Sequence, residues 1–222
     1  MAHLIILLAH DPTVRPVFND LTRHLGDAAI NLYAAFLDDS VALAGCAAGD
    51  RVSVIAQADS KLLGRLQAPA GPQVIMVPDL RPASLASAVA SALADGPVVL
   101  LRGDMPHLPI WRLRDALTYL DGGTDVVIGP GEAGGWYLIG LRFAHPALLR
   151  ALPGSDGMPD DLCIAAATHG LRVMQFPAWY TLDTLADLER LAADLRTMPP
   201  DVAPQTRILL NEDGINSRAV GG

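Results

Sequence analysis

This chain has 222 residues, of which 51% are hydrophobic and 18% charged, enough apolar material for one sizeable core. Its net charge of −8, with Lys61 as the only lysine, leaves no basic stripe, which argues against nucleic acid as a partner. The two cysteines, Cys46 and Cys163, lie in no CxxC pattern and beside no histidine at ligand spacing, so we expect free, buried thiols.

The apolar start of the chain lacks the features of an export signal. Residues 1–9 carry no basic leader and no small-residue cleavage site, and Asp11-Pro12 follows at once. No apolar stretch approaches the roughly 20 residues needed to cross a bilayer. We therefore expect a cytoplasmic protein with no membrane partner.

Apolar runs typical of buried strands alternate with segments of helical periodicity. The predicted strands span residues 4–8, 52–56, 74–77, 98–101, 126–128, 136–141 and 171–176. The predicted helices span 17–25, 27–44 with Asp27 as cap, 59–66, 82–93, 110–120, 146–152, 160–168 and 183–195. A glycine-rich loop joins the fifth and sixth strands without a helix, which favours an antiparallel pair. The pattern predicts an α/β fold, a three-layer α/β/α sandwich around a mostly parallel, mixed sheet of about seven strands.

The alternation of strands and helices ends near residue 198. We expect a single domain over residues 1–198. The remaining segment, 199–222, is mostly polar and glycine-rich apart from Ile208-Leu209-Leu210. It is predicted to be a partly disordered tail.

An acidic residue stands where one of the predicted strands ends. Gly103-Asp104 follows the run 98–101, with Pro106 shortly after. In open α/β sheets, ligands sit at the carboxyl ends of the strands, so Asp104 could meet a ligand or a metal there. The alternative is an ordinary turn or helix-capping aspartate.

Three stretches carry a family resemblance when they are taken together. They are Gly-Asp-Met-Pro at 103–106, the glycine-rich loop and strand at 129–141, and Leu-Asp-Thr-Leu-Ala-Asp-Leu at 182–188. With them the chain resembles the bacterial selenodomain-associated transferases, a glycosyltransferase-A-like (GT-A-like) family of the nucleotide-diphospho-sugar transferase superfamily. The resemblance covers roughly residues 4–195. It implies a Rossmann-like sheet that binds a nucleotide diphosphate, a divalent metal and transferase chemistry.

The resemblance assigns the metal and the catalytic role to two aspartates. Asp104, the predicted catalytic residue, and Asp183 could converge above the sheet and hold Mg²⁺ or Mn²⁺ together with substrate phosphates. The metal would offset the charge of the leaving phosphate groups. For Asp183 the alternative is a helix start, because Thr184 and Asp187 follow it.

The remaining candidate residues fall into two groups. The predicted nucleotide-binding residues are Ala9, His10, Arg15, Arg102 and Gly103. The predicted substrate-binding residues are Glu132, Gly134, Gly135 and Trp136, where the glycines permit close approach of a ligand and the indole could stack on a sugar. The alternative for the second group is a hairpin connection followed by a core aromatic residue.

The chain departs from the family pattern at four places. The lysine-rich loop that usually follows the first strand is replaced by residues 9–21, in which Arg15 is the only strong cation. Ala133 and Thr181 stand where aspartates are usual, and residues 77–81 lack the usual glutamine and glycine pattern. Losing two charge-assisted hydrogen bonds would weaken nucleotide binding by on the order of a hundred-fold.

The resemblance implies a metal-dependent glycosyl- or nucleotidyltransferase. It would act between a nucleotide-diphosphate donor, either a nucleotide sugar or a nucleoside triphosphate, and a small-molecule acceptor, as a monomer or a homodimer. The alternative is a catalytically impaired homologue that acts as a binding or regulatory protein, which the altered first loop favours. A hydrolase-like activity supported by His10, Asp11 or His107 is a third hypothesis.

Overall fold

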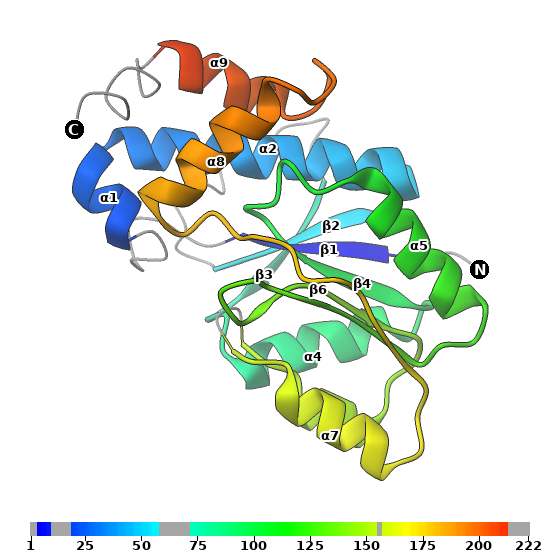
Figure 1. Cartoon of the computed structure of the whole chain (residues 1–222). Coiled ribbons are helices and arrows are strands. Elements are labelled where there is room, and N and C mark those ends of the chain that lie inside the picture. Colours follow the sequence, from blue (N-terminus) through cyan, green and yellow to red (C-terminus); the bar gives the residue numbers. More distant parts are fainter. Residues whose placement is uncertain (1–3, 10–18, 58–71, 155–156, 213–222) are drawn as a thin grey trace.

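The computed structural model describes residues 4–9, 19–57, 72–154 and 157–212. Helices cover both faces of a central sheet, with α2, α8 and α9 on one side and α4 and α7 on the other (Figure 1). The strands are β1 Leu4–Ala9, β2 Val52–Gln57, β3 Gln73–Val77, β4 Val98–Arg102, β5 Val126–Pro130, β6 Trp136–Leu141 and β7 Val173–Gln175. The helices are α1 Asn19–Leu25, α2 Ala28–Ala48, α4 Pro82–Ala92, α5 Ile110–Asp121, α6 Pro146–Arg150, α7 Asp160–Thr168, α8 Leu185–Leu195 and α9 Pro204–Glu212.

The seven strands form one mixed sheet in the order β3-β2-β1-β4-β6-β5-β7. β1 pairs in parallel with β2 and β4, and β7 pairs in parallel with β5. β6 runs antiparallel to both of its neighbours, β4 and β5. The predicted fold class and the antiparallel pair across the glycine-rich loop are both confirmed.

The sheet separates two apolar cores because successive side chains of a strand point to opposite faces. Ile5 and Leu7 of β1 pack toward α2, α5 and α8, whereas Ile6 and Leu8 pack toward α4, α6 and α7. All six residues of β6 are buried, since this strand lies inside the sheet and both of its faces are covered. Because both faces of the sheet are covered, a ligand could reach it only where the strands end.

Several local predictions are corrected by the structure. Asp27 precedes α2, but its side chain makes no capping hydrogen bond. Helix α8 begins two residues later than predicted, because Thr184 accepts from the Asp187 amide and Asp187 accepts from the Thr184 amide in a capping box. Both cysteines are free, as predicted, but neither is fully buried, since Cys46 is exposed and Cys163 is half-buried. The predicted helix at 59–66 lies outside the described residues.

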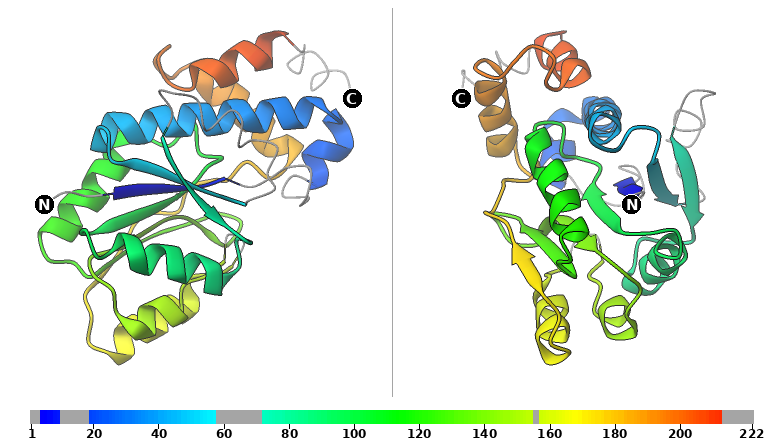
Figure 2. Two further views of the ribbon diagram at one scale, coloured as in Figure 1. Left: turned by 180° about the vertical axis from the view of Figure 1, so that it is seen from behind. Right: turned by 90° about the vertical axis from the view of Figure 1, so that its right-hand side faces the viewer.

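Residues beyond 198 contribute to the packed body. Helix α9 lies against α2, as the two views of Figure 2 agree. The buried carboxylate of Asp39, in α2, accepts from the backbone amides of Gln205 (3.1 Å) and Thr206 (2.8 Å), and from the Thr206 hydroxyl (2.7 Å). This carboxylate therefore satisfies amides at the start of α9, which an α-helix cannot satisfy internally. The packed body continues past the boundary placed at 198.

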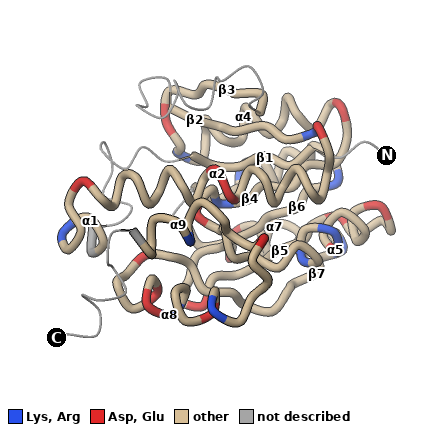
Figure 3. Tube along the Cα trace, turned by 90° about the horizontal axis from the view of Figure 1, so that it is seen from above, with Lys and Arg blue, Asp and Glu red and all other residues tan. Residues whose placement is uncertain are grey.

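Charged residues are interspersed over the described part of the trace, with basic positions separated by acidic ones (Figure 3). Of the helices described, none combines the length and the apolar character needed to cross a membrane.

Candidate functional site

The candidate site lies where β1 and β4 end side by side. After β1 the chain adds β2 and β3 on one side of this strand and then crosses over to add β4 on its other side. The strand order therefore reverses between β1 and β4. The Gly103 amide donates to the Leu8 carbonyl at 3.0 Å. A Cβ at position 103 would stand 2.7 Å from that carbonyl oxygen, so a residue without a side chain is required.

Arg102, the last residue of β4, joins the two predicted aspartates. Its Nε donates to Oδ1 of Asp104 at 2.9 Å, and its Nη2 donates to Oδ2 of Asp104 at 2.5 Å. The same Nη2 donates to Oδ1 of Asp183 at 3.0 Å. Asp104 and Asp183 therefore converge on one cation, as the sequence predicted, but the cation is a guanidinium.

Burial differs sharply within this trio. The side chain of Asp104 is fully buried and that of Arg102 is 8% exposed, whereas that of Asp183 is 37% exposed. Burial alone would lower the pKa of Arg102, but the charges of Asp104 and Asp183 outweigh it and hold that pKa above its ordinary value. The trio thus contains one fixed positive charge, and its open side is Asp183.

Both aspartates are held in place by other elements. The Met105 amide donates to the Ser40 hydroxyl at 3.1 Å, which fixes the loop after β4 to α2. The Thr181 hydroxyl donates to Oδ2 of Asp183 in a short hydrogen bond, and the Asp183 amide donates to Asp187 at 3.2 Å. The helix-start alternative for Asp183 is thus partly realised, since its backbone joins the first turn of α8 while its carboxylate faces Arg102.

The resemblance implies that Asp104 and Asp183 hold a divalent metal. Mg²⁺ and Mn²⁺ require oxygen ligands that face the ion. Here both oxygens of Asp104 accept from Arg102, and the guanidinium lies between the two carboxylates. Within the described ranges, no group of three His, Cys, Asp or Glu side chains is arranged to hold a metal ion. The pair does not fit a metal bound jointly by both carboxylates.

The other predicted nucleotide-binding residues are only partly placed. Ala9 ends β1 and is fully buried beside the Gly103 turn. His10 and Arg15 lie outside the described residues. Arg102 and Gly103 are at the site, and for all of these residues the role in nucleotide binding remains a prediction.

The glycine-rich loop lies close to the same edge. Gly134 and Gly135 have φ values of 100° and 69°, a region that favours glycine. Glu132 accepts from Arg190 of α8 at 2.6 Å, so the loop is tied to the helix that follows Asp183. Trp136 is fully buried, and its indole N–H donates to the Gly154 carbonyl at 3.1 Å. Its ring therefore takes the core position, the second of its two predicted roles, and offers no free face to a sugar here.

An aromatic cluster that the sequence analysis did not identify supports the loop after β4. His107 is 1% exposed, and its ring lies 4.2 Å from Tyr180 and 5.9 Å from Trp179, between centroids. Burial lowers the pKa of His107 to about 4, so the ring is neutral at pH 7. This burial does not support the hydrolase hypothesis for His107. The only sequence signal was the closeness of His107 to Asp104.

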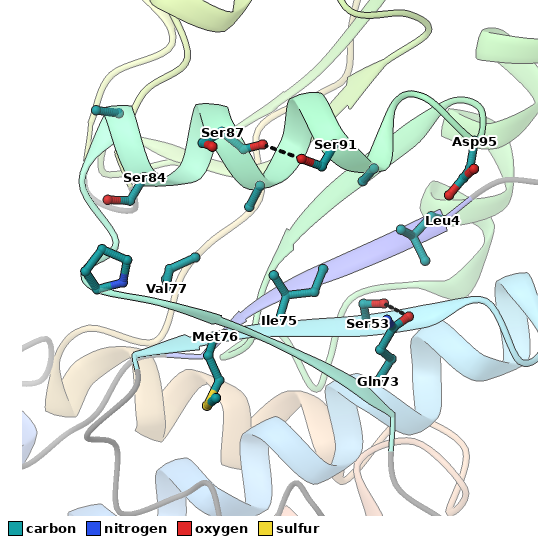
Figure 4. A pocket seen from close by; sticks show the side chains of 14 residues that line it. Leu4, Ser53, Gln73, Ile75, Met76, Val77, Ser84, Ser87, Ser91 and Asp95 are labelled. Carbon is teal, nitrogen blue, oxygen red and sulfur yellow. Dashed lines mark hydrogen bonds between the residues drawn. The ribbon is translucent and has the colours of Figure 1, made fainter.

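Two cavities lie away from the trio. One of about 680 Å³ lies between β3 and α4, where Ser84, Ser87 and Ser91 line the helix side and Ile75 the sheet side (Figure 4). Another of about 440 Å³, mainly apolar, lies among residues 39–46, 106–111 and 198–204. Neither is lined by a described residue of the predicted nucleotide, substrate or metal site, although His107, named in the hydrolase hypothesis, lines the second.

Comparison with known proteins agrees with this architecture. The family model described as "Uncharacterized protein conserved in bacteria (DUF2064)" matches residues 22–156. No curated protein shows significant sequence similarity to the chain. A crystal structure from Desulfovibrio desulfuricans G20, named provisionally as a nucleotide-diphospho-sugar transferase, superposes with a TM-score of 0.82. It is 24% identical, and the match covers 98% of this chain and 97% of that one.

Two further structures share the fold at lower similarity. CMP:2-keto-3-deoxy-manno-octonic acid synthetase in complex with CTP has a TM-score of 0.57 and 17% identity, over 89% of this chain and 99% of that one. Rv0371c from Mycobacterium tuberculosis H37Rv in complex with manganese has a TM-score of 0.54 and 21% identity, over 86% and 97%. At these identities the likeness establishes the fold.

Proposed function

We propose that this chain, which belongs to the DUF2064 family, is a transferase that takes a nucleotide sugar or a nucleoside triphosphate as donor. The observation that carries the proposal is the meeting of Arg102 and Asp183, 81 residues apart in sequence, at the reversal point of the sheet. Open α/β sheets bind ligands at such points. Asp104, which is fully buried, binds the guanidinium of Arg102 through two hydrogen bonds and acts as a positioning residue.

The names of structures with this fold support a donor of nucleotide type. One was crystallised with CTP, and another is named provisionally for nucleotide-diphospho-sugar transfer. In the proposed reaction an acceptor oxygen bonds to the phosphorus or anomeric carbon of the donor. The bond to the leaving phosphate oxygen breaks, the leaving group keeps the electron pair, and the proton of the acceptor passes to water.

The manganese complex of Rv0371c raises the question of a metal for this chain. A single carboxylate with donor phosphates can hold Mg²⁺, and Asp183 is the exposed carboxylate of the trio. Joint binding by Asp104 and Asp183, as first predicted, would require the guanidinium to leave. The proposed function is therefore built on the residues of this chain, and none of its steps depends on a metal.

The proposal is tested by thermal-shift titration of the full chain with nucleoside di- and triphosphates and nucleotide sugars, each in EDTA and with Mg²⁺ or Mn²⁺. A ligand that binds the native state raises its apparent stability. We expect one base to give a shift that Arg102→Gln removes and Arg142→Gln, at the opposite end of the sheet, preserves. No shift with any nucleotide at millimolar concentration would reject the donor site and favour the binding or regulatory alternative.

A further inference from the structure

The trio has a charge arrangement that differs from a pair of metal ligands. Two carboxylates with a divalent cation between them would carry no net charge, whereas Asp104, Asp183 and Arg102 together carry a net charge of −1. The positive charge is covalently attached to β4 and cannot exchange with solvent. A guanidinium also remains charged at every physiological pH.

Displacing this guanidinium would be costly. A divalent ion placed between the two carboxylates would push Arg102, 8% exposed, away from both of its partners while leaving it buried. A buried charge that loses its partner is strongly unfavourable. The ion pair with Asp104 is bidentate and buried, so we expect this half of the trio to persist when a ligand binds.

The contact of the trio that a ligand could displace is the one between Arg102 and Asp183. It is a single hydrogen bond of 3.0 Å to an aspartate that is 37% exposed. Among the residues that the structure describes, the side chain of Arg102 donates hydrogen bonds through Nε and Nη2, and its Nη1 makes none. A phosphate oxygen could therefore bind Nη1 and compete with Asp183 for Nη2, in the two-point geometry that guanidinium groups form with phosphates.

We infer that Arg102 occupies the place that the resemblance assigns to a divalent metal, and that it binds a phosphate of the donor directly, in competition with Asp183. This inference rests on the proposed function and specifies how the donor is held. It makes two predictions that a metal bridge does not make. Donor binding should be indifferent to chelation, and removing the charge of Asp183 should strengthen binding rather than weaken it.

The experiment measures the affinity of the best nucleotide from the panel by calorimetry, in EDTA and in Mn²⁺, for the wild type and for Asp183→Asn. We expect equal affinities in the two buffers and a gain of about tenfold in the variant, because a competing negative charge is removed. Asp115→Asn is the matched control. It removes the same charge from an exposed aspartate of α5, outside the trio and its hydrogen-bond partners, so little change is expected.

Three other results would overturn the inference. Binding that requires Mn²⁺ and is lost in Asp183→Asn would overturn the inference and leave the proposed transferase standing with a metal bridge. Binding that is indifferent to EDTA but weaker in Asp183→Asn would also overturn it, since Asp183 would then hold the donor. Absence of nucleotide binding by the wild type in both buffers would reject the proposed function and the inference together. These measurements use the exposed aspartate, so they do not depend on folding of an Arg102 variant.

Discussion

An arginine–aspartate cluster lies at each end of the central sheet, and the numbers of arginines and aspartates are reversed between the two. At the carboxyl ends of β1 and β4, the single Arg102 serves two carboxylates. At the opposite end, directly before β5, the single carboxylate of Asp125 serves two arginines. It accepts from Nε and Nη2 of Arg142, at 2.9 and 2.6 Å, and lies 3.9 Å from Nε of Arg172.

The exposure of the arginines also differs. The side chains of Arg142 and Arg172 are 38% and 66% exposed, whereas that of Arg102 is 8% exposed. An exposed arginine that loses its partner is solvated by water, whereas a buried one is not. The same residue types therefore form an ion pair whose loss water can compensate at one end of the sheet, and a buried ion pair that the fold requires at the other.

The strongest test of this comparison is the pair Arg102→Leu and Arg142→Leu. Loss of Arg102 leaves the fully buried Asp104 without its arginine, and we expect the free energy of unfolding to fall by about 3–5 kcal/mol. Loss of the half-exposed Arg142 should cost about 1 kcal/mol or less. Urea denaturation of both variants measures the difference, and equal losses would show that burial does not separate the two clusters.

Another buried carboxylate pairs with no arginine among the described residues. Asp39 is 4% exposed and is satisfied by the amides of Gln205 and Thr206. We expect Asp39→Ala to cost about 1–2 kcal/mol and to release α9 from α2. Hydrogen exchange should show faster exchange within 204–212. Asp39→Asn keeps one acceptor oxygen but turns an NH2 group toward the other donor, so its exchange should be intermediate. Unchanged exchange in the alanine variant would refute the role.

The far cluster should also respond to acid. Burial would raise the pKa of Asp125, but the Arg172 amide and Arg142 outweigh it and hold that pKa below 3.8. A lowered pKa in the folded state gives stability that is present above the unfolded value and is lost as pH falls through the folded value. The destabilisation by Asp125→Asn, about 1 kcal/mol at pH 7, should therefore shrink below pH 4. A difference in melting temperature that stays constant from pH 7 to pH 3 would contradict this.

The smallest stability effect is expected at the open side of the trio. Asp183→Asn leaves the bidentate pair of Arg102 and Asp104 intact and changes a group that is 37% exposed. We expect a change of at most about 0.5 kcal/mol in the free energy of unfolding. Thermal denaturation measures it, and a loss comparable to that of Arg102→Leu would mean that Asp183 belongs to the obligatory part of the site.

Much of the candidate site could be located from the sequence. The apolar run 98–101 followed by Gly103-Asp104 placed an aspartate at a strand end, because a buried strand needs consecutive apolar residues and a turn needs glycine. The motif at 182–188 supplied its partner Asp183. Arg102 was among the predicted nucleotide-binding residues, but its pairing with the two aspartates was not predicted, since an arginine at the end of an apolar strand is usually expected to reach solvent.

The order of the strands and helices along the chain follows from local patterns, because apolar periodicity and turn residues act over a few neighbouring positions. The partners of the buried charges, in contrast, lie far away in the sequence. The guanidinium of Arg102 meets an aspartate 81 residues later, and Asp39 meets the start of α9 more than 160 residues later. The apolar run Ile208-Leu209-Leu210 is too short to predict a helix, and α9 is stabilised by packing against α2. Such partners are chosen by packing and by the need to pair buried charges, which no local pattern records.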